Sequence, residues 1–148
     1  MKQTLLITTA LITTALMLIV GCSKTIDVDK LVERGGLLYE VNSDKPFSGE
    51  GVSYYSNGQK KSEVTFKDGK EDGLSSSWWE NGQKKSEVTF KDGKEDGFFT
   101  YWYENGQKEY EGTYIWMSEQ YSGLKRFTKS SKRWDQDGKI TMENGWVY

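Results

Sequence analysis

The chain has 148 residues, a length typical of one domain, with 20 basic and 22 acidic side chains and a formal net charge of -2. The absence of histidine excludes Ser-His-Asp and Cys-His catalysis, and the single cysteine excludes an internal disulfide and a cysteine-rich zinc site. The near-neutral charge argues against a dedicated nucleic-acid-binding protein, which usually has a strongly basic face. We therefore expect no catalytic residue, no metal site and no cofactor.

Residues 1–21 have the pattern of an N-terminal export signal. Lys2 precedes an apolar run from Leu5 to Val20 that is interrupted only by threonines. A run of this length could also span a membrane as a helix. Because the residues that follow the run resemble a processing site, we expect a signal helix here.

The end of the run, Ile19-Val20-Gly21-Cys22, resembles the lipoprotein box of bacterial export signals. The resemblance implies cleavage between Gly21 and Cys22, a diacylglyceryl thioether on Cys22 and acylation of the new amino group. More than one acyl chain is needed for stable anchoring, because each buried CH₂ contributes only about 0.8 kcal/mol. We expect a lipid-anchored protein of the bacterial cell envelope, at the outer membrane of a Gram-negative cell or otherwise at the outer face of the cell membrane. The alternative is a plain export signal with an incidental cysteine.

The segment after the anchor is short and polar. Residues 22–34 predict a lipidated cysteine and a tether with one helical turn, which separates the membrane from the fold. Residues 37–53 predict a first hairpin with a long turn through residues 42–46.

A tandem repeat forms the body of the chain. Residues 57–73 read NGQKKSEVTFKDGKEDG, and residues 81–97 are identical at all 17 positions. A third copy begins at Asn105 and diverges by Tyr114, so that the period is 24 residues. Such a period indicates an array in which each unit is one supersecondary motif.

Each unit predicts two strands joined by tight turns. Asn-Gly pairs open the repeats and Asp-Gly pairs lie in their middle, and both are strong hairpin signals because type I′ turns need positive φ at both central residues. Between the turns, residues alternate in a way that indicates a half-buried antiparallel strand. One face of the outgoing strand carries Ser86, Val88 and Phe90, and the other carries Lys85, Glu87 and Thr89.

Large aromatic residues alternate to both faces at the end of each incoming strand. Tyr55, Trp79 and Tyr103 point away from their predecessors Tyr54, Trp78 and Trp102. In one interpretation both rows are packing. In the other, the row Tyr55, Trp79 and Tyr103 stays exposed and is the candidate binding surface.

These repeats resemble the MORN repeat, most closely its bacterial variant. The resemblance rests on residues 73–87 and 90–97, and on their counterparts at 51–73 and 97–114. It implies an all-β fold in which tandem β-hairpins form an elongated, twisted, single-layer antiparallel sheet. It also implies a role in protein or membrane association without catalytic residues. Many such proteins are labelled antitoxins of toxin–antitoxin pairs, which fits poorly with an envelope location.

The repeat pattern is lost after Tyr114. Asp137-Gly138-Lys139 resembles the repeat turn once more, but with an excess of eight residues. We expect residues 35–114 to be the repeats and residues 115–148 to be an irregular C-terminal capping repeat that closes the sheet edge. The cap holds the one basic cluster, which predicts either a solvated loop or a contact with anionic headgroups or cell-wall polymers: Lys125, Arg126, Lys129, Lys132 and Arg133.

Together these patterns predict a non-catalytic envelope lipoprotein that serves as a protein-interaction or scaffold module. Its expected partners are the membrane, through the lipid anchor, and an unidentified protein, with no nucleic acid. An alternative is binding of cell-wall glycan or surface polysaccharide, and a further one is an antitoxin role. Glycoside hydrolysis is disfavoured because a catalytic carboxylate pair occurs once, in a cleft, whereas one glutamate recurs in each repeat: Glu63, Glu87 and Glu111.

Overall fold

The computed structural model describes residues 24–119 and 123–144. The predicted signal helix, the cleavage site after Gly21 and the lipidation site at Cys22 lie outside these residues. In the part of the chain that is described, no helix is long and apolar enough to cross a membrane.

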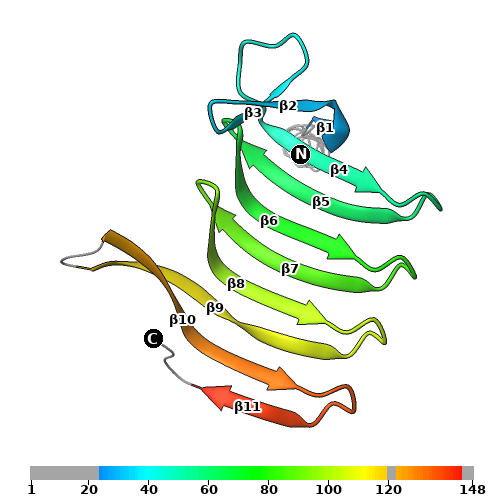
Figure 1. The fold of residues 1–148 in the computed structure, drawn as a ribbon, viewed down its shortest axis with the longest axis vertical. Coiled ribbons are helices and arrows are strands. Elements are labelled where there is room, and N and C mark those ends of the chain that lie inside the picture. The colour runs from blue at the N-terminus through cyan, green and yellow to red at the C-terminus, as the bar shows by residue number, and fades with distance from the viewer. Residues whose placement is uncertain (1–23, 120–122, 145–148) are drawn as a thin grey trace, which may run out of the picture.

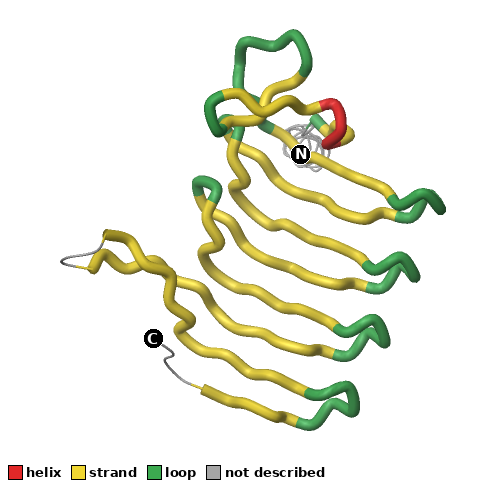
Figure 2. Tube along the Cα trace, in the orientation of Figure 1, coloured by secondary structure: helices red, strands yellow, loops and turns green. Residues whose placement is uncertain are grey.

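One nine-stranded sheet makes up most of the molecule (Figures 1 and 2). From β4 onward, each strand pairs antiparallel with the next strand in the chain. The hairpins stack along the long axis in a single curved layer, which confirms the all-β fold expected from the repeats. In spatial order the strands are β1 (Thr25–Asp27), β4 (Gly49–Tyr54), β5 (Lys60–Lys67), β6 (Lys70–Trp78), β7 (Lys84–Lys91), β8 (Lys94–Trp102), β9 (Lys108–Glu119), β10 (Gly123–Trp134) and β11 (Ile140–Asn144).

Residues 25–34, which we expected to belong to the tether, instead form regular structure against the first repeat. β1 runs parallel to β4, with Ile26 opposite Gly51. The predicted helical turn is present as a 3-10 turn, η1 (Val28–Lys30), which Asp27 caps by accepting a hydrogen bond from the Asp29 amide. The half-buried Ile26 and Val28 side chains explain the difference, since they give this segment apolar surface to place on the sheet.

The hairpin predicted over residues 37–53 is wrong. β3 (Leu37–Glu40) pairs with β2 (Leu31–Arg34) in a separate two-stranded sheet, and β4 pairs with β1 and β5. Phe47 anchors the loop between β3 and β4, because its ring is 3% exposed and lies 5.9 Å from the ring of Phe66. Its amide donates to Leu38 O at 2.8 Å and its carbonyl accepts from Gly69 N at 2.8 Å, so the loop is bound to the first Asp-Gly turn.

The C-terminal part continues the sheet more regularly than we expected. β9 and β10 are 12 residues long, so the extra residues of the last repeat lengthen their hairpin, which protrudes from the stack in Figure 1. Asp135 N then donates to Lys139 O at 2.9 Å, and Gly138 N donates to Asp135 O at 3.0 Å. The same bonds close the Asn-Gly turns, for example at Tyr103. The fourth turn therefore keeps the geometry of the repeat without its Asn-Gly sequence.

The core lies on one face of the sheet, which we call the core face and define by Val64, Val88 and Phe99. Phe99 is 1% exposed and its ring lies 4.1 Å from that of Tyr114 and 4.9 Å from that of Tyr110. The register places Gly112 directly opposite Phe99. A Cβ on Gly112 would lie 2.6 Å from Phe99 Cζ, so the glycine lets the ring lie flat over the neighbouring strand.

Candidate functional site

The predicted binding row Tyr55, Trp79 and Tyr103 lies where the strands enter the Asn-Gly turns. All three rings are half-buried. Tyr55 Oη donates to Trp78 O at 2.7 Å, and Trp79 Nε1 donates to Trp102 O at 3.1 Å. Tyr103 Oη donates to Trp134 O at 2.9 Å. Each ring thus joins its own turn to the next repeat.

The asparagines of the same turns make a second set of bonds between repeats. Asn57 Nδ2 donates to Glu80 O at 3.2 Å and Asn81 Nδ2 donates to Glu104 O at 2.9 Å, while each Oδ1 accepts an amide within its own turn. Asn105 Nδ2 reaches Gln136 O at 3.3 Å. Because the polar atoms of both rows are used between repeats, the geometry favours the packing interpretation of Tyr55, Trp79 and Tyr103.

The opposite face of the sheet, which we call the glutamate face, is defined by Glu63, Glu87 and Glu111. The register places Ser76 directly between Glu63 and Glu87, and Thr100 between Glu87 and Glu111. Since neighbouring strands are about 4.8 Å apart, a glutamate recurs roughly every 10 Å along the sheet. The three carboxylates therefore form a periodic row separated by small hydroxyl side chains.

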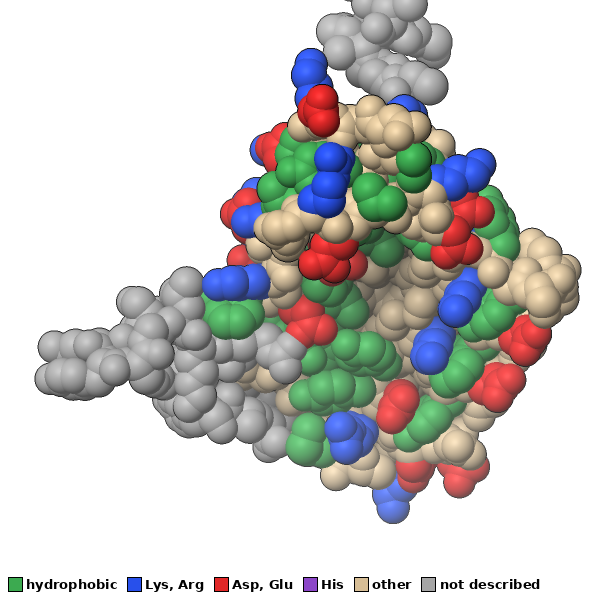
Figure 3. All heavy atoms as spheres, turned by 45° about the horizontal axis from the view of Figure 1, so that its top comes forward, with side chains coloured by type: hydrophobic (Ala, Val, Ile, Leu, Met, Phe, Trp, Pro, Cys, Tyr) green, Lys and Arg blue, Asp and Glu red, His purple; other side chains and the backbone are tan. Residues whose placement is uncertain are grey.

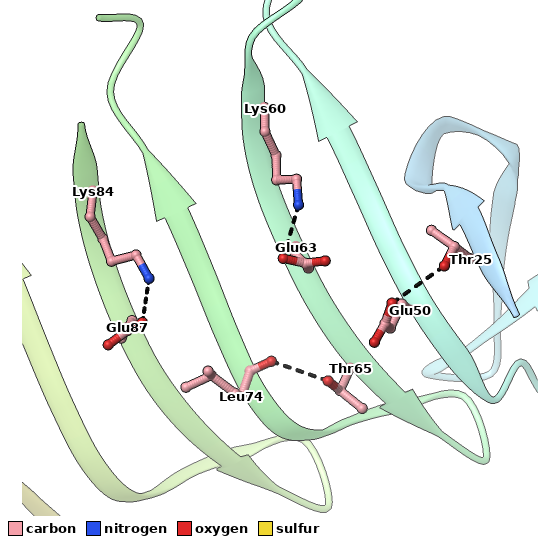
Figure 4. A network of polar contacts seen from close by, with 8 residues as sticks. All are labelled: Thr25, Glu50, Lys60, Glu63, Thr65, Leu74, Lys84 and Glu87. Atoms are coloured by element: carbon pink, nitrogen blue, oxygen red, sulfur yellow. Dashed lines mark hydrogen bonds and ion pairs between the residues drawn. The ribbon is translucent and has the colours of Figure 1, made fainter. Parts of the chain in front are cut away.

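Each glutamate of the row is paired with a lysine of its own strand, not across strands as the sequence indicated (Figure 4). Lys60 Nζ lies 3.1 Å from Glu63 Oε2, Lys84 contacts Glu87, and Lys108 Nζ lies 2.7 Å from Glu111 Oε2. All six side chains are 33–50% exposed, so each pair contributes at most about 1 kcal/mol to stability. Because the glutamates are two strands apart and individually paired, they do not form a close carboxylate pair.

Aromatic rings accompany the lysines along the same edge of the glutamate face. Lys60 Nζ and Lys84 Nζ lie 5.2 and 5.4 Å from the centre of the Trp78 ring, one from each side of the strand. Lys108 Nζ lies 5.9 Å from the centre of the Trp134 ring. Such cation–π contacts hold the lysine side chains along the row.

Apolar side chains on the other side of the row are left open. Leu74 is 50% exposed and Phe98, its equivalent one repeat later, is 76% exposed. Phe98 is the most exposed of the large hydrophobic residues in the described part of the chain. Figure 3 shows hydrophobic side chains interspersed with charges of both signs, around a hollow with a floor of small side chains and backbone.

A cavity of about 470 Å³ lies at the C-terminal end of the glutamate face. Phe98, Thr100 and Glu111 contribute to its lining, together with Lys132 and Glu143. Lys132 Nζ lies 2.9 Å from Glu143 Oε1. The hydrogen bond to Glu143, and then the charges of Glu143 and Glu111, raise the pKa of Lys132, so its ammonium group stays protonated.

Sequence reasoning missed this cavity, although two signals pointed toward it. Phe98 replaces Leu74 at the position that directly follows the identical 17-residue segment. Lys132 belonged to the predicted basic cluster, for which we expected a loop or an anionic contact. Lys132 and Arg133 instead lie in β10, where Arg133 Cζ is 5.0 Å from the centre of the Tyr110 ring. The side chains of Lys125, Arg126 and Lys129 lie outside the described part.

Comparison with known families identifies the repeats. The sequence model of the MORN repeat variant matches residues 48–68, 71–92 and 95–115. The first match covers most of the β4–β5 hairpin, and the others cover its equivalents one and two repeats later. No curated protein and no solved structure matches the chain. The chain thus carries three tandem repeats similar to the MORN variant, a type of repeat that is generally a non-catalytic interaction module.

Proposed function

We propose that the protein is a lipoprotein of the bacterial cell envelope, anchored through Cys22, whose repeats form a non-catalytic protein-interaction module. The lipoprotein box at residues 19–22 supports the anchor. The three tandem repeats support the interaction role. The anchor would hold the single-layer sheet at a membrane surface, where it can collect a partner.

The exposure of the glutamate face is the observation that carries the interaction role. Leu74 and Phe98 are exposed side by side with half-buried Trp78 and Trp102, and no second layer of described structure covers them. A partner that covers this apolar surface gains roughly 25 cal/mol for each Å² removed from water. The alternating Lys–Glu pairs around it give a polar rim that favours one orientation of the partner.

The interaction role is tested with the double substitution Leu74→Ser and Phe98→Ser in the full-length protein. Because both side chains are exposed, we expect an unchanged unfolding transition and loss of the partner that chemical cross-linking in intact cells captures with the natural sequence. Val41→Ser is the matched control, since Val41 is 57% exposed but lies in the β3–β4 loop. Retention of the same cross-linked partner by the folded double variant would show that this face is not the binding surface.

The anchor has a separate test. Replacing Cys22 by Ala should leave an unprocessed precursor without acyl chains, as measured by mass spectrometry of the intact protein. A processed, soluble product from the Cys22→Ala variant would refute lipidation at this residue.

A further inference from the structure

The cavity beside Phe98 has the dimensions of a small-molecule site. Its volume of about 470 Å³ falls within the range of roughly 300–1,000 Å³ that is usual for such sites. The residues that line it come from four neighbouring strands, β8 to β11, and all of their large side chains belong to the glutamate face. The cavity is therefore built on the sheet ladder and not on a loop.

The lining combines one open ring with several hydrogen-bonding groups. Phe98 offers a flat apolar surface, because 76% of the residue is exposed. Thr100 and Thr113 add hydroxyl groups, and Glu111 and Glu143 add carboxylates. A carboxylate has about four acceptor sites, so Glu111 can still accept hydrogen bonds while it contacts Lys108 at 2.7 Å.

Charges in and around the cavity balance. Lys108 pairs with Glu111 and Lys132 pairs with Glu143 at 2.9 Å, which leaves two positive and two negative groups. An anionic or a cationic ligand would have to break one of these pairs. An uncharged ligand with many hydroxyl groups can donate to the carboxylates and accept from the ammonium groups without breaking either pair.

A peptide fits this position less well. Peptides that bind sheets through their main chain add a strand to a free edge, whereas this cavity lies on a face where β8, β9 and β10 are paired on both sides. A ligand must therefore be recognised through side chains alone. An aromatic platform surrounded by carboxylates and hydroxyls suits the apolar face and the hydroxyl rim of a sugar ring.

From these features we propose that the cavity binds a sugar unit of a linear, uncharged polysaccharide. The polymer would run across the strands, because the Lys–Glu pairs of the cavity recur at Lys84–Glu87 and Lys60–Glu63, about 10 Å apart. Leu74 replaces the Phe98 ring one repeat earlier, so the cavity at Phe98 is the strongest subsite. Further subsites add to the affinity because they act on a ligand that is already bound.

The test measures binding of two soluble probes to the full-length protein in a detergent without sugar headgroups. The probes are an oligomer of N-acetylglucosamine and an oligomer of β-linked glucose, followed by isothermal titration calorimetry. We expect at least one probe to bind. Phe98→Ala should weaken it at least about tenfold, and Phe98→Trp should retain it. Leu74→Ala, on the same face one repeat earlier, should weaken it much less.

Glu111→Gln keeps this test independent of the protein-interaction role. The substitution keeps the shape of the side chain and removes its charge, so we expect weaker sugar binding at an unchanged denaturation midpoint. Failure of both probes to bind at millimolar concentration would overturn the proposal. Equal binding by the natural protein and by Phe98→Ala and Glu111→Gln would also overturn it, as would binding only of a charged polymer such as polyglutamate.

Discussion

Single glycines decide how the aromatic core can pack. Gly112 has no positive φ, but a Cβ at this position would clash with the Ser130 carbonyl oxygen and with the Phe99 ring. We therefore expect Gly112→Ala to lower the free energy of unfolding by about 1–3 kcal/mol, as overpacking does elsewhere. Denaturant unfolding measures the loss.

Gly58→Asn is the control for that substitution. Gly58 has a φ of +83° with no atom within 4 Å of an added Cβ, and asparagine tolerates this conformation. We expect a loss below about 0.5 kcal/mol. Equal losses at the two positions would mean that backbone conformation, and not the contact with Phe99, is what Gly112 provides.

Tyr114 makes the core sensitive to high pH. Burial, and then the neighbouring Tyr101 and Tyr110, raise the pKa of Tyr114 from 10.0 to about 12. The folded state therefore favours the neutral phenol, and this contribution is complete below about pH 10 and is lost as the pH rises toward about 12. Tyr114→Phe should lose less stability over this range, as measured by denaturant unfolding at a series of pH values. Parallel loss in both proteins would contradict this role.

Adjacent residues show how far the sequence predicts the face of a side chain. Strict alternation correctly places Phe98 and Phe99 on opposite faces. It does not show which of the two packs, and the structure gives 76% exposure for one and 1% for the other. The difference arises because Gly112 lies opposite Phe99, and that register is set by pairing between strands far apart in sequence.

At the scale of the turn, the aromatic row stabilises the stack of repeats. Tyr55→Phe and Tyr103→Phe each keep the ring but leave a backbone carbonyl of the next repeat without its donor. We expect each substitution to cost about 1 kcal/mol of unfolding free energy. Chemical denaturation of the single variants measures the change.

Tyr54→Phe is the comparison for this row, because Tyr54 is adjacent in sequence and 53% exposed. We expect it to change stability by less than about 0.5 kcal/mol. Full stability of Tyr55→Phe and Tyr103→Phe, combined with loss of the partner, would restore the binding role that the sequence assigned to this row.

Hairpins were predictable from the sequence, but the pairing at the N-terminal end was not. Asn-Gly and Asp-Gly pairs carry their own turn geometry, so each repeat hairpin can be placed from local residues alone. The parallel pair of β1 with β4 depends on contacts such as Ile26 opposite Gly51, over 20 residues away. No local pattern encodes such a contact, and the short polar segment therefore read as a tether.

For the whole molecule, the repeats predict that one unit can be removed without loss of the fold. Deletion of residues 74–97 joins Gly73 to Phe98, so the chain continues in the same register with one repeat fewer. We expect a folded protein with a lower melting temperature, because each unit contributes its own stability and one interface. Circular dichroism during heating measures both the β content and the transition.

A deletion of one further residue, 74–98, provides the control. It shifts all later strands by one position and moves every side chain to the other face. We expect this variant to lose its cooperative transition. If the 24-residue deletion unfolds the protein as completely as the 25-residue deletion does, the repeats are not independent units in register.

The cavity could not be predicted because it combines the third repeat with the C-terminal strands. Glu111 and Lys132 are 21 residues apart, and the lengthened β9–β10 hairpin places them opposite each other. The 24-residue period contains no information on that hairpin, since the period ends before it. The predicted cap thus supplies part of the candidate site.

Ligand binding on the glutamate face is tested most directly by a photo-reactive amino acid placed at position 98 of the full-length protein in its native membrane. A matched protein carries the same group at position 41, which is also exposed but lies in the β3–β4 loop. After irradiation, mass spectrometry should find a defined covalent adduct at position 98 and none at position 41. No adduct at position 98, or the same adducts at both positions, would contradict the assignment of function to this face.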